Sequence, residues 1–152
     1  DILSLRINRW HRRYEEPGAP VVPLEEYPER AVVTLSVHDT SSLRGWWLEE
    51  TEKERFWESF GFSGPPPQEL GGEDQETIIR AESTAPSRLC ILQLQDILGM
   101  NPDIRPSDPS EEQINQPGTM NSKNWSYRMP INIEKLQENE EFSSKIRTAL
   151  KR

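Results

Sequence analysis

The sequence lacks the features of secreted, membrane-spanning and nucleic-acid-binding proteins. Its 152 residues include one cysteine, Cys90, so no intrachain disulfide can form and a cytoplasmic location is expected. It has no apolar run long enough to cross a membrane and no signal-peptide pattern. Positive charge is scarce, because 18 Lys and Arg face 26 Asp and Glu, and the net charge of −8 disfavours nucleic acids and anionic membranes as partners.

Sequence patterns for cofactors and metals are also missing. There is no Gly-rich phosphate loop, no Cys/His metal spacing and no Ser-His nucleophile motif, so we expect no cofactor and no metal.

The one basic cluster, Arg6–Arg13, is followed at once by two Glu and is expected to be a solvated rim. The low hydrophobic content of 33%, with 13 Pro, predicts a thin core that packs partly on something outside the chain. A start at Asp1 rather than Met fits a piece of a longer protein.

Three short apolar runs predict the strands of a parallel sheet. They cover Ile2–Ile7, Ala31–His38 and Arg88–Leu94, with helix and loop patterns between them. The second run is followed by Asp39, and the third leads into Asp96. The β-α-β order implies a parallel sheet with a right-handed crossover.

The pair His38-Asp39 follows an apolar strand, at the position where α/β barrels carry their catalytic residues. Helix capping is the competing interpretation, because Asp39, Thr40 and Ser41 are all good N-cap residues for the helix that follows. The residues alone favour capping for Asp39 and a hydrogen-bonded structural role for His38.

The remaining pattern predicts helices and one long loop. Trp46, Trp47 and Trp57 are expected in the core, and Gly61 is expected to end a helix. The predicted elements are a helix from about Ser41, a helix from a capping box at Thr51 to Phe60, a loop over Phe62–Asp74, a helix over Gln75–Ser83, and a terminal helix capped by Asn132 with a stripe of Leu136, Phe142, Ile146 and Leu150.

The segment from Ile114 to Pro130 is dense in Asn, Ser, Thr and aromatic residues. Amides and hydroxyls can bond sugar hydroxyls, and a flat ring such as that of Trp125 can stack on a pyranose face. An ordinary surface loop with one buried Trp explains the same composition equally well.

Three segments together resemble a known family. SVHDTSSLRGWW, LQLQDILGM and INQPGTMNSKNWSYRMP resemble, in order, the C-terminal part of the 4-α-glucanotransferases (amylomaltases or disproportionating enzymes, glycoside hydrolase family 77), from Leu3 to about Leu136. The resemblance implies a (β/α)8 TIM barrel of which residues 1–152 are a C-terminal part, about strands six to eight, with no separate domain inside. It also implies transfer of an α-1,4-glucan segment to the 4-hydroxyl of glucose or another maltodextrin, with retention.

The resemblance assigns roles to individual residues. Asp39 matches a carboxylate that stabilises the oxocarbenium-like transition state, and His38 matches its sugar-binding neighbour. Asp96 matches no catalytic position, so a capping or structural role is expected, and Gln113 stands where many members carry Arg. The implied substrate-binding residues are His38, Asn115, Pro117, Thr119, Asn124 and Trp125.

The nucleophile and the acid/base of such enzymes would lie upstream of Asp1, so this chain alone is expected to be inactive. Its partners would be α-1,4-glucans, glucose and the missing N-terminal part of the barrel. Two alternatives stay open: a non-catalytic glucan-binding remnant, and a related α-glucan hydrolase in which water accepts the intermediate.

Overall fold

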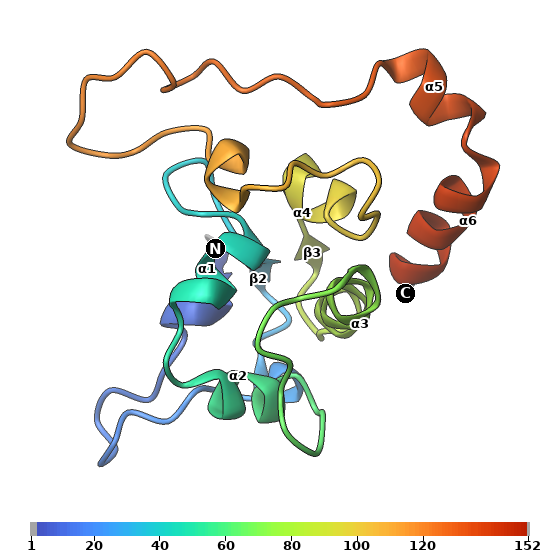
Figure 1. Cartoon of the computed structure of the whole chain (residues 1–152). Coiled ribbons are helices and arrows are strands. Elements are labelled where there is room, and N and C mark those ends of the chain that lie inside the picture. The colour runs from blue at the N-terminus through green and yellow to red at the C-terminus, as the bar shows by residue number, and fades with distance from the viewer. Residues whose placement is uncertain (1–2, 152) are drawn as a thin grey trace.

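The computed structural model describes residues 3–151 and is built around a small parallel sheet (Figure 1). Strand β1 covers Ser4–Ile7, β2 covers Ala31–Thr34 and β3 covers Leu89–Cys90, in the order β1-β2-β3. All the pairs are parallel, with Ser4 opposite Ala31 and Val32 opposite Leu89. The predicted parallel sheet is therefore confirmed, while the expected strand start at Ile2 lies outside the described residues.

Two strands end earlier than their apolar runs predicted. β2 stops at Thr34 instead of His38, and β3 stops at Cys90, with Leu94 already opening helix α4 (Leu94–Leu98). Leu35 is only 1% exposed, but its carbonyl accepts a hydrogen bond from the Arg9 guanidinium instead of from a neighbouring strand. Burial therefore continues beyond the strand, and an apolar run alone cannot show where the ladder of hydrogen bonds stops.

Helix α1 covers Leu43–Glu49 and α2 covers Lys53–Ser59. The capping box predicted at Thr51 is wrong, because α2 begins two residues later and no side chain caps it. The Glu50 carboxylate accepts from the Glu52 N–H at 2.7 Å and supports this turn instead. Gly61 has φ +84° directly after α2, which confirms the predicted helix end.

Helix α3 covers Gly72–Ser83 and starts three residues before the prediction. The Asp74 carboxylate accepts from the Gly71 N–H at 2.8 Å and so satisfies one end group of the helix. A Cβ at Gly72 would lie 2.5 Å from the Met100 carbonyl oxygen, so this close approach of two segments requires glycine. The predicted loop over Phe62–Asp74 is thus shorter than expected.

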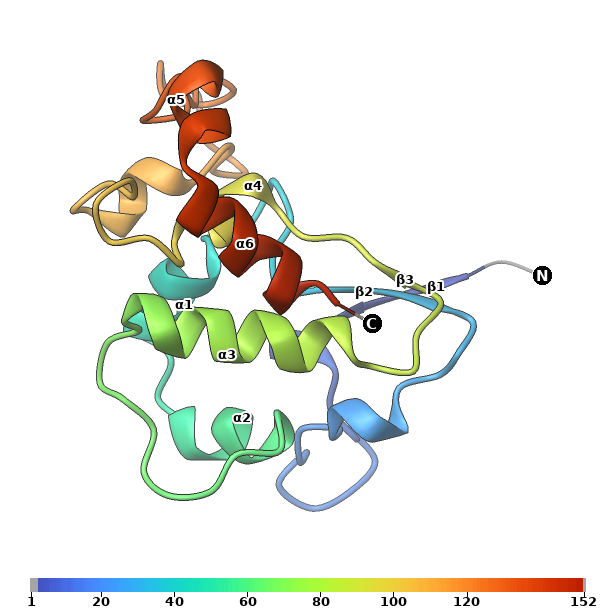
Figure 2. The same ribbon diagram turned by 90° about the vertical axis from the view of Figure 1, so that its right-hand side faces the viewer.

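The terminal segment forms two helices, α5 (Ile133–Glu138) and α6 (Glu140–Ala149), where one was predicted. Asn132 accepts from the Lys135 N–H, which confirms its predicted cap. Asn139 separates the helices and accepts from the Phe142 N–H at 2.9 Å. α6 lies beside α3 (Figure 2), with Phe142 2% exposed.

The two faces of the sheet differ. On one face Ala31, Val33 and Leu35 are at most 1% exposed, and Val33 and Leu35 share one core cluster with side chains of α1 to α3. Figure 2 shows α2 and α3 together on one side of the sheet. The expected aromatic core is confirmed there: Trp47 is fully buried, Trp57 packs against the core, and Trp46 meets Phe56 edge-on with ring centroids 4.7 Å apart. Alternate residues of a strand point to opposite faces, so the next residues along β2 face the other way.

The opposite face is an open apolar groove of about 480 Å³. Val32, Thr34, Ser36 and His38 line it from β2 and the loop beyond, together with exposed apolar side chains such as Leu5 and Ile91. Leu5 is 57% exposed and Ile91 58% exposed. No helix within residues 3–151 is both long enough and apolar enough to cross a membrane.

Candidate functional site

The loop from Leu35 to Ser42 joins β2 to α1 and carries His38 and Asp39 at its tip. Its turn is closed by the Thr40 N–H, which donates to the Val37 carbonyl at 2.9 Å, and by the Thr40 hydroxyl oxygen, which accepts from the Val37 N–H at 3.0 Å. Both tip side chains are about half exposed, with His38 Nε2 3.4 Å from Asp39 Oδ2. The turn therefore presents an imidazole and a carboxylate to solvent at the carboxyl edge of the sheet.

Asp39 does not cap α1, so the capping interpretation is wrong. The N-cap is Ser42, whose hydroxyl oxygen accepts from the Gly45 N–H at 3.2 Å. Asp39 Oδ1 instead accepts from Asn115 Nδ2 at 2.6 Å, across 76 residues of sequence. The acid is thus oriented by an amide from the Asn-rich segment.

That segment reaches out from the body of the molecule between α4 and α5 (orange in Figure 1) and lies across the His38-Asp39 turn at its start. The Asn115 N–H donates to the His38 carbonyl at 3.0 Å, and the Trp125 N–H donates to the Ile114 carbonyl at 2.7 Å. Trp125 places its ring 5.3 Å from the His38 ring. The structure therefore brings together Asp39, His38, Asn115 and Trp125.

Trp125 is 66% exposed, so the alternative of one buried Trp in this segment is wrong. Its φ is +62°, a conformation that few residues other than glycine adopt. Such a backbone persists only where the surrounding contacts fix it, and it is found preferentially at functional sites.

The other three residues predicted to bind substrate, Pro117, Thr119 and Asn124, lie in the part of the segment that does not contact Asp39. Asn124 accepts from the Gln116 N–H at 3.0 Å and donates to the Thr119 carbonyl at 3.1 Å. The Thr119 hydroxyl donates to the Gln116 carbonyl at 2.8 Å. Pro117 lies within the same turn. These side chains fold the loop on itself, and none of these hydrogen bonds reaches Asp39.

An open cavity of about 380 Å³ adjoins Asp39 on the side of β1. Trp10, 54% exposed, forms part of its wall with Ser41 and Gln113. Gln113 also donates to the Asn115 carbonyl at 3.0 Å. Sequence reasoning missed Trp10, although its position directly after the first strand, at the same edge as Asp39, was a usable signal.

Arg9 also lines this cavity but is only 8% exposed, so the interpretation of the whole basic cluster as a solvated rim is wrong. Its guanidinium lies over the Trp46 ring, 4.9 Å from the ring centroid. The pattern of charges in the sequence gave no sign of this, because an arginine beside other arginines more often faces water.

Two buried carboxylates bond to the two ends of the Asp39 loop. Asp96 is fully buried, and it accepts from the Ser36 hydroxyl and from the Leu43 N–H at 2.7 Å. Burial raises the pKa of Asp96 to about 6, against the opposing effect of these hydrogen bonds. The expected structural role of Asp96 is confirmed, since it fixes both the exit of β2 and the first turn of α1.

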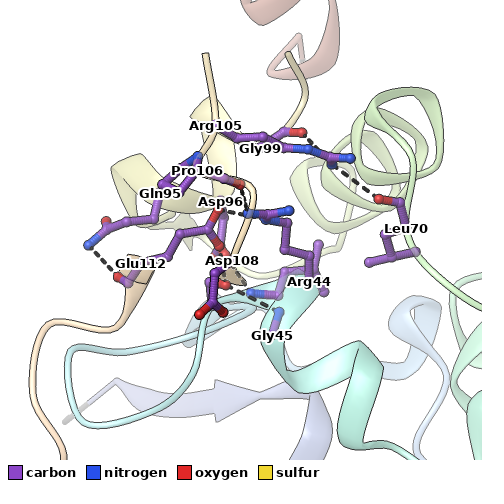
Figure 3. Close-up of polar contacts among 12 residues, drawn as sticks. Arg44, Gly45, Leu70, Gln95, Asp96, Gly99, Arg105, Pro106, Asp108 and Glu112 are labelled. Carbon is purple, nitrogen blue, oxygen red and sulfur yellow. Dashed lines mark hydrogen bonds and ion pairs between the residues drawn. The ribbon is translucent and has the colours of Figure 1, made fainter. Parts of the chain in front are cut away.

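Glu112 is the second buried carboxylate, at the end of the short 3₁₀ helix Pro109–Glu112. It accepts from Arg44 Nε at 2.6 Å and from the Ser42 hydroxyl, and its backbone carbonyl accepts from Gln95 at 3.2 Å (Figure 3). Arg44 also donates to the Pro106 carbonyl. Charged groups at this depth require such pairing, and the pairs join α1, α4 and the segment leading to Asn115.

Within residues 3–151, no group of three or more His, Cys, Asp or Glu side chains is arranged to hold a metal ion. The site consists of one exposed carboxylate, its imidazole neighbour, an orienting amide and two exposed indole rings, of which that of Trp10 lines the cavity. Hydroxyl-rich ligands suit such a surface, because carboxylates and amides bond hydroxyls and flat rings stack on sugar faces.

The fold and the site define a segment of a parallel α/β protein whose polar residues gather at the carboxyl edge of the sheet. The chain belongs to the 4-alpha-glucanotransferase family, which matches residues 1–134. It is 33% identical to a 4-alpha-glucanotransferase of Chlamydia pneumoniae over 149 residues, which are 98% of this chain and 28% of that protein. The counterpart from Chlamydia muridarum is 32% identical over 143 residues, 94% of this chain and 27% of that protein.

Solved structures agree with this assignment at the level of the fold. An amylomaltase from Streptococcus agalactiae in complex with acarbose superposes with a TM-score of 0.68 at 18% identity, covering 99% of this chain and 27% of that one. The amylomaltase from Corynebacterium glutamicum gives 0.64 at 21% identity, covering 99% and 26%. The resemblance found in the sequence is confirmed, and the chain spans little more than a quarter of these relatives.

Proposed function

We propose that the protein containing this chain is a 4-alpha-glucanotransferase that moves an α-1,4-glucan segment to the 4-hydroxyl of glucose or another maltodextrin, with retention. The observation that carries the proposal is the contact of Asp39 with Asn115 at the carboxyl edge of β2, inside the region that matches the family. The three strands are then about strands six to eight of a (β/α)8 barrel, whose catalytic groups gather at this edge.

In this proposal Asp39 binds hydroxyls of the sugar at the cleavage point. Such bonds strengthen as positive charge develops on the ring, so they stabilise the transition state more than the bound substrate. His38 and Asn115 orient Asp39 and bind neighbouring hydroxyls, while Trp125 offers a face for stacking. Pro117, Thr119 and Asn124 shape the rim of the substrate site.

Retaining transfer requires a nucleophile and an acid/base in fixed geometry. Asp96 and Glu112 bond to the Asp39 loop, but both are buried in hydrogen bonds to Ser36 and Ser42. Glu49 and Glu50 line the same cavity as Asp39, but the family resemblance assigns the nucleophile and the acid/base to positions upstream of Asp1. We therefore expect both catalytic groups on the rest of the longer protein, and no activity from this chain alone. The open groove beside Leu5 and Ile91 would receive the other strands of the barrel.

The test is the product pattern of the full-length protein with maltotriose. A transferase yields glucose and longer maltodextrins, a hydrolase yields only shorter products, and a binding remnant yields none. Asp39→Asn should lower kcat by at least about 10²–10³-fold, because a carboxylate facing developing charge contributes a large electrostatic stabilisation. Near-normal turnover of this variant would remove Asp39 from the mechanism.

A further inference from the structure

We propose that Arg9 is a positioning residue for Asp39: it holds together the two ends of the loop over 35–41, and thereby fixes the direction in which the carboxylate points. This inference rests on the proposed function for its catalytic consequence. The geometry of the loop can be tested without it.

The contacts of Arg9 lie at both ends of the loop. Nη2 donates to the Leu35 carbonyl at 3.2 Å and to the Ser41 carbonyl at 3.0 Å, and Nη1 donates to the Ser41 hydroxyl at 3.2 Å. Leu35 is where β2 has just ended, and Ser41 is the residue before the N-cap of α1. One planar guanidinium therefore sets the distance between the two ends of the turn that carries His38 and Asp39.

Arg9 lies in the segment that follows β1, whereas the loop that it holds follows β2. It lies in the short 3₁₀ helix Asn8–Trp10 directly after β1, and β1 pairs with β2 in parallel. The register of these strands, with Ile7 opposite Thr34, brings the arginine beneath the neighbouring loop. The position of Asp39 is thus linked to the pairing of β1 and β2.

The guanidinium is held firmly enough to act in this way. It is 8% exposed and lies over the Trp46 ring, where a cation and an aromatic face attract each other. Burial lowers the pKa of Arg9 to about 10, while Asp96, Glu49 and Glu50 act in the opposite direction. Arg9 therefore stays charged at neutral pH and bonds both carbonyls with charge-assisted hydrogen bonds.

Loss of these bonds would leave the Leu35 carbonyl buried without its partner, since Leu35 is 1% exposed. The loop would still have its own Val37–Thr40 turn and the Asn115 contacts at its tip. We expect the loop to stay folded on average but to shift, and its own hydrogen bonds to open more often. A displacement of about 1 Å of a catalytic group can cost about 10²-fold in rate.

Arg12 provides a matched control. It lies three residues further along, with its side chain 16% exposed, its guanidinium over the Phe56 ring at 5.2 Å, and an ion pair to Glu52 at 2.7 Å. Its hydrogen bond goes to the Ala19 carbonyl, away from the loop over 35–41. Arg9→Gln and Arg12→Gln therefore each remove a cation that lies over an aromatic ring, and only the first touches the loop.

Amide hydrogen exchange in the full-length protein tests the geometry. Arg9→Gln should raise exchange over residues 36–41 by about tenfold or more, while Arg12→Gln leaves it unchanged. Arg9→Lys keeps the charge but not the fork of donors, so it should fall between Arg9→Gln and the parent, and it serves if Arg9→Gln does not fold. Unchanged exchange over 36–41 in the Arg9 variants would overturn the proposal.

A double-mutant cycle with Asp39→Asn tests the catalytic consequence. In the parent, Arg9→Gln should lower kcat on maltotriose by about 10²-fold with KM changed by less than about threefold, and Arg9→Lys should restore part of the loss. In the Asp39→Asn background the same change should have almost no effect. Equal losses in both backgrounds, or an equal loss from Arg12→Gln, would overturn the positioning role. A parent without glucan products would overturn the proposed function instead, and the exchange measurement would still decide the role of Arg9.

Discussion

Glu82 is a carboxyl group in the interior that contacts no cation among the described side chains. It lies on α3, is fully buried, and accepts from Asn8 Nδ2 at 2.7 Å. Burial raises its pKa from 4.5 to about 8, and the Asn8 hydrogen bond offsets only part of that effect. The folded chain therefore keeps a proton that the unfolded chain releases, so the free energy of unfolding should fall as the pH rises from about 4.5 to about 8.

Glu82→Gln should remove this dependence, since glutamine keeps the shape and an oxygen acceptor for Asn8 but does not titrate. The variant should exceed the parent by about 1–3 kcal/mol at pH 8 and show little difference near pH 5. Urea unfolding at both pH values gives the comparison. Asp96, with its pKa raised to about 6, should still cause a decline between about pH 4 and 6 in both proteins. The same slope above pH 6 in parent and variant would contradict the assignment to Glu82.

Trp125→Ala should weaken glucan binding more than it slows the chemistry, because the exposed indole contributes contact area and no proton. Loss of one stacking ring costs about 1–2 kcal/mol, which is about 5- to 30-fold in KM. Steady-state kinetics of the full-length protein on maltodextrins measure this. Met120→Ala is the control, since Met120 is fully exposed in the same segment. An unchanged KM would show that Trp125 does not bind substrate.

At the scale of elements, local signals predicted the kinds of structure better than their ends. Asn132 capped its helix as expected because the contact involves only neighbours along the chain. Thr51 failed because the Glu50 carboxylate competes for the amides at the start of α2. The break at Asn139 was hidden by an apolar pattern that continues through both helices.

The residues of the candidate site also differ in how well local sequence signals predicted them. His38 and Asp39 were found because they are adjacent in sequence and follow a strand. The composition of its segment pointed to Trp125, whereas Asn115 required the family pattern, since Asp39, its partner, lies 76 residues away. Arg9 was missed because nothing near it in sequence shows that its side chain passes beneath another loop.

Phe142 should determine whether α6 stays on α3. Phe142 lies on α6 and is 2% exposed. Phe142→Ala should therefore weaken the docking of this helix by a free energy of about 3–5 kcal/mol. Hydrogen exchange over Glu140–Ala149 should rise while exchange over β2 stays the same. Ile133→Ala on α5, where the side chain is 69% exposed, should change neither. Equal protection of α6 in both variants would show that other contacts dock it.

Across the whole fold, the main exposed apolar surface is the open face of the sheet, which the proposed barrel would cover. Ile91 is 58% exposed on that face, whereas Leu48 on α1 is 48% exposed on the side covered by helices. Judged by exposure in this chain alone, a lysine should be tolerated at Ile91 at least as well as at Leu48.

The proposed barrel predicts the reverse order for the full-length protein. Ile91→Lys would place a charge in the barrel interior and should abolish cooperative unfolding or lower Tm strongly, whereas Leu48→Lys should be nearly neutral. Thermal unfolding of both variants provides the measurement. Tolerance of Ile91→Lys would contradict the proposed packing of further strands on this face.

The loop that carries Asp39 is held by residues from distant parts of the chain. Its contacts with Arg9, Asp96 and Asn115 span 26, 60 and 76 residues of sequence. On the ribosome, β2 would emerge long before Asn115, so the strand can form while its loop still lacks the amide that orients the carboxylate. Contacts of such sequence separation form late. The site should therefore be among the last parts of the protein to mature, and a nascent chain that stops before residue 115 should contain the strand without the arranged acid.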